Sequence, residues 1–108
     1  MEQDFWLEKF RREALPLIIH HFRPEKVLVF GSRARGTASR ESDLDIIIIA
    51  DRFSGIPFIQ RMPRMLKLVP FPKHVDYLCY TPEEFRRLKH TSSILIDAME
   101  APIELAVS

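Results

Sequence analysis

The stretch Gly31–Asp45, GSRARGTASRESDLD, holds a Gly-Ser pair, ten further residues and an Asp-x-Asp pair that leads into four isoleucines. The run before it, residues 27–30, is β-branched and aromatic and stops at Gly31, which is typical of a buried strand that feeds a turn. Residues 45–50 predict a second strand, and because this strand is apolar on both faces we expect it to be central in its sheet. The stretch therefore predicts a turn between two strands.

The rest of the chain predicts alternating helices and strands. We expect an amphipathic helix over residues 4–22 that is bent or interrupted at Pro16, a strand over 75–80, a helix from the cap Thr81 to about Lys89, a short helix through Met99 and an edge strand over 102–107. With 108 residues and no linker or repeat, the chain is expected to be a single domain, residues 1–108.

No acidic residue occurs between Asp51 and Asp76, so this segment is cationic. Helical spacing would place its apolar residues on one face, opposite its basic residues. The apolar set is Phe58, Met62, Met65, Leu66 and Val69, and the basic set is Arg61, Arg64 and Lys67. Pro63 argues against an undistorted helix. We interpret the basic face as solvated surface, with an acidic partner or an outgoing pyrophosphate as alternatives.

Composition excludes several classes of function. The net charge of +1 gives no general attraction to nucleic acid or anionic lipid, so nucleic acid is an unlikely partner. No apolar run is long enough to span a bilayer, so no membrane partner is expected. The start of the chain lacks the layout of a secretory signal, and the single cysteine, Cys79, is expected to be a core residue. These features predict a cytoplasmic protein. Oligomerisation stays open.

The two carboxylates of the motif suit a divalent cation. Side chains two residues apart on a strand point the same way, so Asp43 and Asp45 would project together. A divalent ion would relieve their repulsion, and Mg²⁺ accepts a few carboxylates while keeping positions for phosphate oxygens and water. An Asp-x-Asp that only caps a strand is the alternative.

Asp76 supplies a third carboxylate near the start of the strand over residues 75–80. An exposed aspartate at a strand end would explain it alone, but three acids at the ends of two adjacent strands fit the cluster that two-metal phosphoryl and nucleotidyl transfer uses. The four histidines show no zinc spacing, and we interpret them as structural or exposed: His20, His21, His74 and His90.

The Gly-Ser turn suits an anion. Gly31 permits a close backbone approach, and Ser32 adds a hydroxyl to the exposed N–H groups. Arg33 and Arg35 could each meet phosphate oxygens, or could brace the loop by pairing with a carboxylate such as Glu41. No Gly-Lys-Ser/Thr follows at Walker A spacing, so P-loop hydrolysis is not expected. The turn and the carboxylates together indicate a site for a metal-bound nucleoside triphosphate.

These residues closely resemble the minimal nucleotidyltransferases of the DNA polymerase beta superfamily. The resemblance implies an α+β fold with a small mixed β-sheet flanked by helices, two Mg²⁺ ions, and transfer of a nucleoside monophosphate from a triphosphate such as ATP to a hydroxyl. It also implies that Asp43 and Asp45 ligate both metals and that Asp76 completes the catalytic metal site and helps to deprotonate the acceptor. Gly31 and Ser32 would hold the triphosphate, and we add Arg35 to this set.

The resemblance also suggests a partner. Free-standing members of this size resemble antitoxins that silence a HEPN ribonuclease toxin by adding AMP to a tyrosine hydroxyl, so we expect a HEPN-type partner. Transfer to a small molecule or an RNA end is an alternative that the same residues permit. A second alternative is an antitoxin that acts by binding alone.

Overall fold

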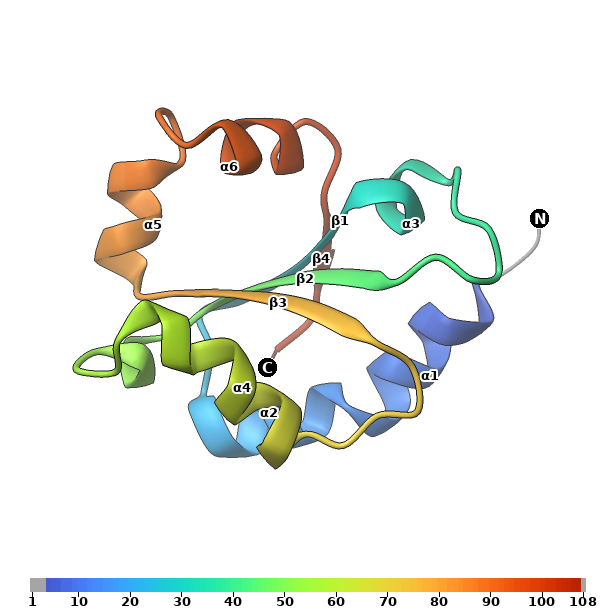
Figure 1. Cartoon of the computed structure of the whole chain (residues 1–108), viewed down its shortest axis with the longest axis horizontal. Helices are drawn as coiled ribbons and strands as arrows, with labels where there is room; N and C mark the ends of the chain where they lie inside the picture. Colours follow the sequence, from blue (N-terminus) through green and yellow to red (C-terminus); the bar gives the residue numbers. More distant parts are fainter. Residues whose placement is uncertain (1–3, 108) are drawn as a thin grey trace.

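A computed structural model of the chain describes residues 4–107, so the first three residues of the acidic start lie outside the described part. The elements, in chain order, are α1 (Phe5–Glu13), α2 (Leu15–Phe22), β1 (Lys26–Phe30), α3 (Gly31–Arg35), β2 (Leu44–Ile49), the 3-10 helix η1 (Asp51–Phe53), α4 (Phe58–Leu68), β3 (Val75–Tyr80), α5 (Pro82–Leu88), α6 (Ser93–Ala98) and β4 (Ile103–Leu105) (Figure 1). In the described part, no helix is both long enough and apolar enough to cross a membrane.

The strands form one mixed sheet in the order β3-β2-β1-β4. β1 pairs antiparallel with both β2 and β4, and β2 pairs parallel with β3. The predicted α+β class with a small mixed sheet is confirmed. The central place of β2 and the edge place of β4 agree with the sequence patterns that predicted them.

Helices cover both faces of the sheet (Figure 1): α1, α2 and α4 lie on one side, and α5 and α6 lie on the other. Alternate residues of β2 therefore reach different cores. Ile46 and Ile48 belong to the core under α1 and α2, whereas Ile47 and Ile49 belong to the core under α5 and α6. This double burial explains why β2 is apolar at every position after Asp45.

Local signals set the helix ends as predicted. Thr81 accepts a hydrogen bond from the backbone N–H of Glu84, and the Glu84 side chain accepts one from the N–H of Thr81, so the capping box at α5 is complete. Ser92 caps α6. The predicted helix over residues 4–22 is interrupted, because α1 ends at Glu13 and Pro16 lies in the first turn of α2.

The predicted facing of α4 is wrong at Arg61 and for part of the apolar set, although the remaining residues of both sets face as expected. Arg61, expected on the solvent side, is buried with 4% of its surface exposed, whereas Phe58, Met62 and Leu66 are exposed. The guanidinium group of Arg61 donates to both carboxylate oxygens of Glu84 and to the carbonyl of Cys79. These acceptors compensate the burial of its charge, so the helix turns its cation inward and leaves part of its apolar face outside.

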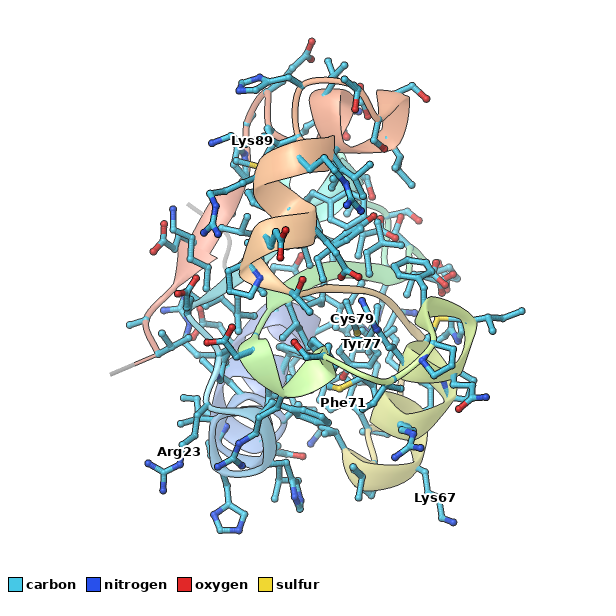
Figure 2. The ribbon with its side chains drawn as sticks, turned by 90° about the vertical axis from the view of Figure 1, so that its left-hand side faces the viewer. Arg23, Lys67, Phe71, Tyr77, Cys79 and Lys89 are labelled. Atoms are coloured by element: carbon cyan, nitrogen blue, oxygen red, sulfur yellow. The ribbon has the colours of Figure 1, made fainter. Side chains whose placement is uncertain are left out.

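Figure 2 shows α4 from the side, with Lys67 pointing away from the sheet and Cys79 inside the molecule. The helix continues through Pro63 instead of breaking there. Proline in a helix interior removes the hydrogen bond to the carbonyl four residues earlier, which belongs to Ile59. Ile59 is 84% exposed, so this part of α4 lies on the surface of the molecule. Cys79 is buried, as predicted.

Candidate active site

Three carboxylates meet at one end of β2 and β3. The two strands are parallel, and their register places Asp45 directly opposite Asp76. Asp43 comes one residue before β2, on the same side as Asp45 because side chains alternate along an extended chain. The structure thus brings together the three acids that the sequence singled out.

The electrostatics of Asp45 reflect this crowding. Its pKa is raised, first by burial and then by the negative charges of Asp76 and Asp43, while Arg33 and His74 lower it by less. Desolvation and like charges both disfavour the ionised form of a carboxyl group. A cation between these groups would relieve both effects.

Gly31 leaves room for Asp45. Its φ of 72° lies in the left-handed region, and a Cβ built on it would collide with Oδ2 of Asp45. Only glycine satisfies both conditions without strain. The predicted turn is the short helix α3, which begins at Gly31 and contains Ser32 in its first turn. The backbone of Gly31 therefore lies directly against the carboxylate of Asp45.

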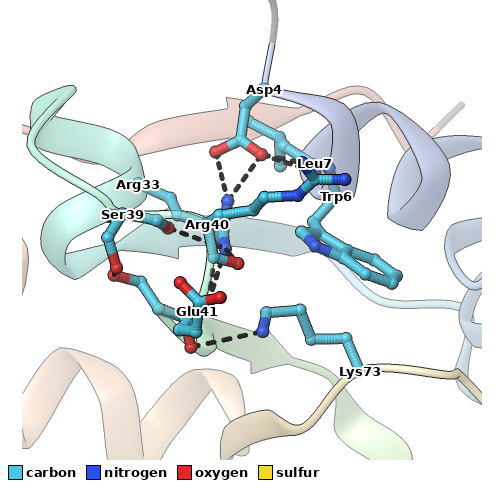
Figure 3. Close-up of polar contacts among 9 residues, drawn as sticks. Asp4, Trp6, Leu7, Arg33, Ser39, Arg40, Glu41 and Lys73 are labelled. Carbon is cyan, nitrogen blue, oxygen red and sulfur yellow. Dashed lines mark hydrogen bonds and ion pairs between the residues drawn. The ribbon is translucent and has the colours of Figure 1, made fainter.

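Arg33 braces the segment that joins α3 to β2 (Figure 3). It is 7% exposed, and its guanidinium group donates to both carboxylate oxygens of Asp4, at 2.6 and 2.7 Å, and to the carbonyls of Ser39 and Ser42. Of the two roles left open by the sequence, the structure favours bracing, although the partner is Asp4 and not Glu41. Burial raises the pKa of Asp4, but Arg33 and two backbone N–H groups of α1 lower it more.

Arg35 lies on the exposed side of α3, where its Nη2 is 2.8 Å from Oδ2 of Asp97 on α6. Both side chains are largely solvated. The predicted nucleotide contact of Arg35 stays a prediction.

His74 is a member of the cluster that sequence reasoning missed. Its Nε2 lies 2.9 Å from Oδ1 of Asp76, and ligand atoms of Asp43, His74 and Asp76 all lie within 4.8 Å of one another. The lack of zinc spacing among the histidines gives no indication of this position. The signal that would have found His74 is its place two residues before Asp76 in an extended segment, which puts both side chains on one side.

The residues present fit a hard divalent ion. Carboxylate oxygens are the ligands that Mg²⁺ prefers, and Asp43, Asp45 and Asp76 supply them from two adjacent strands. Burial and the neighbouring carboxylates raise the pKa of Asp45 more than Arg33 and His74 lower it, so a bound cation would favour its ionised form. The lack of a Cβ at Gly31 lets the carboxylate of Asp45 lie against the backbone at the start of α3, where phosphate oxygens and an ion could meet.

Comparison with known families agrees with this geometry. The sequence profile of the nucleotidyltransferase domain matches residues 7–101, which is most of the chain. The chain belongs to this family. The match includes all three carboxylates and the Gly-Ser pair. Transfer of a nucleotidyl group is the activity of the family, and the protein is a transferase of this kind. None of the curated proteins matches the sequence.

Solved structures show a related fold. A candidate nucleotidyltransferase from Sulfolobus solfataricus aligns with a TM-score of 0.57 and 21% identity, over 96% of this chain and 89% of that chain. The BolA domain of SufE1 from Arabidopsis thaliana aligns with a TM-score of 0.51 and 14% identity, over 78% of this chain and 99% of that chain. At these identities the likeness concerns the fold alone.

Proposed function

We propose that this nucleotidyltransferase uses Mg²⁺ and ATP to transfer AMP to a hydroxyl group of a partner protein, namely a tyrosine of a HEPN-type toxin. The observation that carries the proposal is the pairing of Asp45 with Asp76 across two parallel strands, with Asp43 and Gly31 beside them. This arrangement suits a cluster that holds metal ions against the attacking and leaving oxygens of a transfer reaction.

The residues would divide the reaction between them. The backbone at Gly31 and the hydroxyl of Ser32 would contact the triphosphate, where a positive φ gives a close approach. Asp43, Asp45 and Asp76 would hold two Mg²⁺ ions, which neutralise charge on the triphosphate and lower the pKa of the acceptor hydroxyl.

The carboxylate of Asp76 would accept the proton of the acceptor hydroxyl. The hydroxyl oxygen then forms a bond to the α-phosphorus, and the bond between that phosphorus and the oxygen bridging to the β-phosphorus breaks. Pyrophosphate leaves with the electron pair, and AMP stays on the acceptor as a phosphodiester. Arg33 touches none of the reacting atoms in this scheme and acts as a positioning residue for the loop before Asp43.

The surface of α4 supports a protein acceptor. Phe58, Ile59, Met62 and Leu66 expose between 36% and 84% of their surface along one side of this helix. Arg64 and Lys67 lie on the same helix, and residues 52–75 contain no acid. An apolar strip in a cationic segment suits a partner with apolar side chains and an acidic rim.

The test is to incubate the protein with ATP, Mg²⁺ and the product of the neighbouring gene, and to measure the intact mass of that product. We expect a mass increase of one or more AMP groups. Asp43→Asn should abolish the increase. The matched control is Asp51→Asn, which alters an exposed acid in η1 beyond the opposite end of β2 and should preserve it. An unmodified partner, or equal modification by Asp43→Asn, would contradict the proposal.

Two outcomes would favour other functions. Labelled nucleotide that appears on RNA or on a small molecule, and not on protein, would indicate a different acceptor. If Asp45→Asn and Asp76→Asn variants neutralised the partner as well as the wild type does, binding would suffice and transfer would be incidental.

A further inference from the structure

A fourth side chain, that of His74, lies beside the carboxylate cluster. In the parallel register of β2 and β3, Leu44 lies opposite Val75 and Asp45 lies opposite Asp76. The backbone N–H of Leu44 donates to the carbonyl of His74 at 3.3 Å, which extends the pairing by one residue before β3. Two adjacent chains that each project alternate side chains therefore form a two-by-two array, with Asp43 beside His74 and Asp45 beside Asp76.

We propose that His74 is a metal ligand of this array and that it makes the site prefer first-row transition ions over Mg²⁺. The inference rests on the proposed function, because it takes the three carboxylates as the metal site. Imidazole nitrogen suits transition ions, whereas Mg²⁺ favours oxygen ligands and near-ideal octahedral geometry. A mixed set of nitrogen and oxygen donors discriminates between these two classes of ion.

The distances permit a shared ion. The ligand atoms of Asp43, His74 and Asp76 lie within 4.8 Å of one another. Two ligands bound to one ion at about 2.1 Å are separated by at most about 4.2 Å. A small rotation of side chains that are half exposed closes the difference, because His74 and Asp76 have 52% and 48% of their side chains in solvent.

A purely positional role for His74 makes a different prediction. In that role the ring donates an N–H to Asp76, and an exposed pair of this kind contributes little free energy. In the role of a ligand, Nε2 presents its lone pair to the ion and the proton is on Nδ1. Asparagine separates the two roles, because its amide group can still donate to Asp76 but lacks the imidazole nitrogen.

The experiment titrates Co²⁺ and Mg²⁺ separately into metal-free wild-type protein, His74→Asn, His74→Gln and the control His90→Asn, by calorimetry. The visible absorption of Co²⁺ gives a second readout of nitrogen ligation. His90 is exposed and lies between α5 and α6. We expect the two His74 variants to lose about tenfold or more in Co²⁺ affinity and to change the Co²⁺ spectrum. Their Mg²⁺ affinity should stay within twofold of wild type, and His90→Asn should change neither affinity.

Equal losses for both ions in the His74 variants would show that the effect is not specific to a nitrogen ligand and would overturn the inference. Unchanged Co²⁺ affinity and spectrum would overturn it as well, while the carboxylate site and the proposed function would stand. If the wild-type protein bound neither ion, with or without ATP, the proposed function itself would fail.

Discussion

Replacing Arg33 by methionine should destabilise the protein far more than the same change at Arg35, although the two residues lie on one short helix. Arg33 is buried and joins α3 to Asp4 and to the carbonyl of Ser42. Arg35 makes one ion pair in solvent, with Asp97. The difference between the two variants therefore measures how much burial and several acceptors add to the free energy of unfolding that an arginine contributes.

The expected loss of unfolding free energy in Arg33→Met depends on how exposed the acceptors of Arg33 are. Removing one partner of a buried ion pair costs about 3–5 kcal/mol because the other charge is left uncompensated. Asp4 has 23% of its side chain exposed, so water can solvate part of its charge. The carbonyl groups that lose Arg33 lie in the loop before β2, and their hydrogen bonds with Arg33 are only partly buried. We therefore expect a loss of about 2–3 kcal/mol for Arg33→Met. For Arg35→Met we expect less than about 1 kcal/mol.

The assay is urea unfolding of wild type, Arg33→Met, Arg35→Met, Asp4→Asn and the double variant of Asp4 and Arg33. Two effects that share one interaction are not additive, so the double variant should be less destabilised than the sum of the single variants by about 1 kcal/mol or more. Similar losses of unfolding free energy for the two arginine variants would show that burial of Arg33 adds no stability. An additive double variant would refute the assigned pairing with Asp4.

Three further predictions concern other residues. Asp45→Asn should abolish transfer yet raise the Tm at neutral pH. Burial and neighbouring carboxylates raise the pKa of Asp45, so its ionised form destabilises the folded state. The increase in Tm should disappear in acid, where the carboxyl group of the wild type is protonated in both the folded and the unfolded state. Gly31→Ala should cost about 1–3 kcal/mol of stability, measured by urea unfolding, because alanine is strained at this positive φ and its Cβ meets Asp45. Glu84→Gln should cost about 1–3 kcal/mol at neutral pH, since it weakens the acceptor of the buried Arg61. The hydrogen bond from Arg61 lowers the pKa of Glu84, so this stabilisation is present above the unfolded pKa and is lost as pH falls through the lowered folded pKa. Thermal unfolding across this acid range should therefore show a flatter pH dependence for the variant.

Local patterns in the sequence predicted the elements well. The capping box of Thr81 and Glu84 involves residues three apart, and the strand before Gly31 is recognisable from four consecutive residues. Such signals depend on short-range sterics and hydrogen bonds, which the sequence displays directly. The two-residue spacing that puts Asp43 and Asp45 on one side of the chain is also a short-range pattern that the sequence displays directly.

Contacts between distant segments were less predictable. The facing of α4 failed because apolar periodicity takes no account of Glu84, which lies 23 residues from Arg61 and makes burial of that cation favourable. In the same way, Arg33 finds Asp4 at a separation of 29 residues. His74 lies beside Asp43 because β3 pairs parallel with β2, a register that composition does not encode. Its contact with Asp76, two residues away, is local and follows from the sequence alone.

The proposed function requires this site to transfer the nucleotidyl group of ATP and not its terminal phosphate. The most direct measurement runs parallel reactions with α-labelled and γ-labelled ATP, Mg²⁺ and the neighbouring gene product, using wild type and Asp45→Asn. We expect the wild type to attach the α label covalently to the partner and to release the γ label as pyrophosphate, and we expect Asp45→Asn to do neither. Covalent attachment of the γ label, or α labelling that persists in Asp45→Asn, would contradict it.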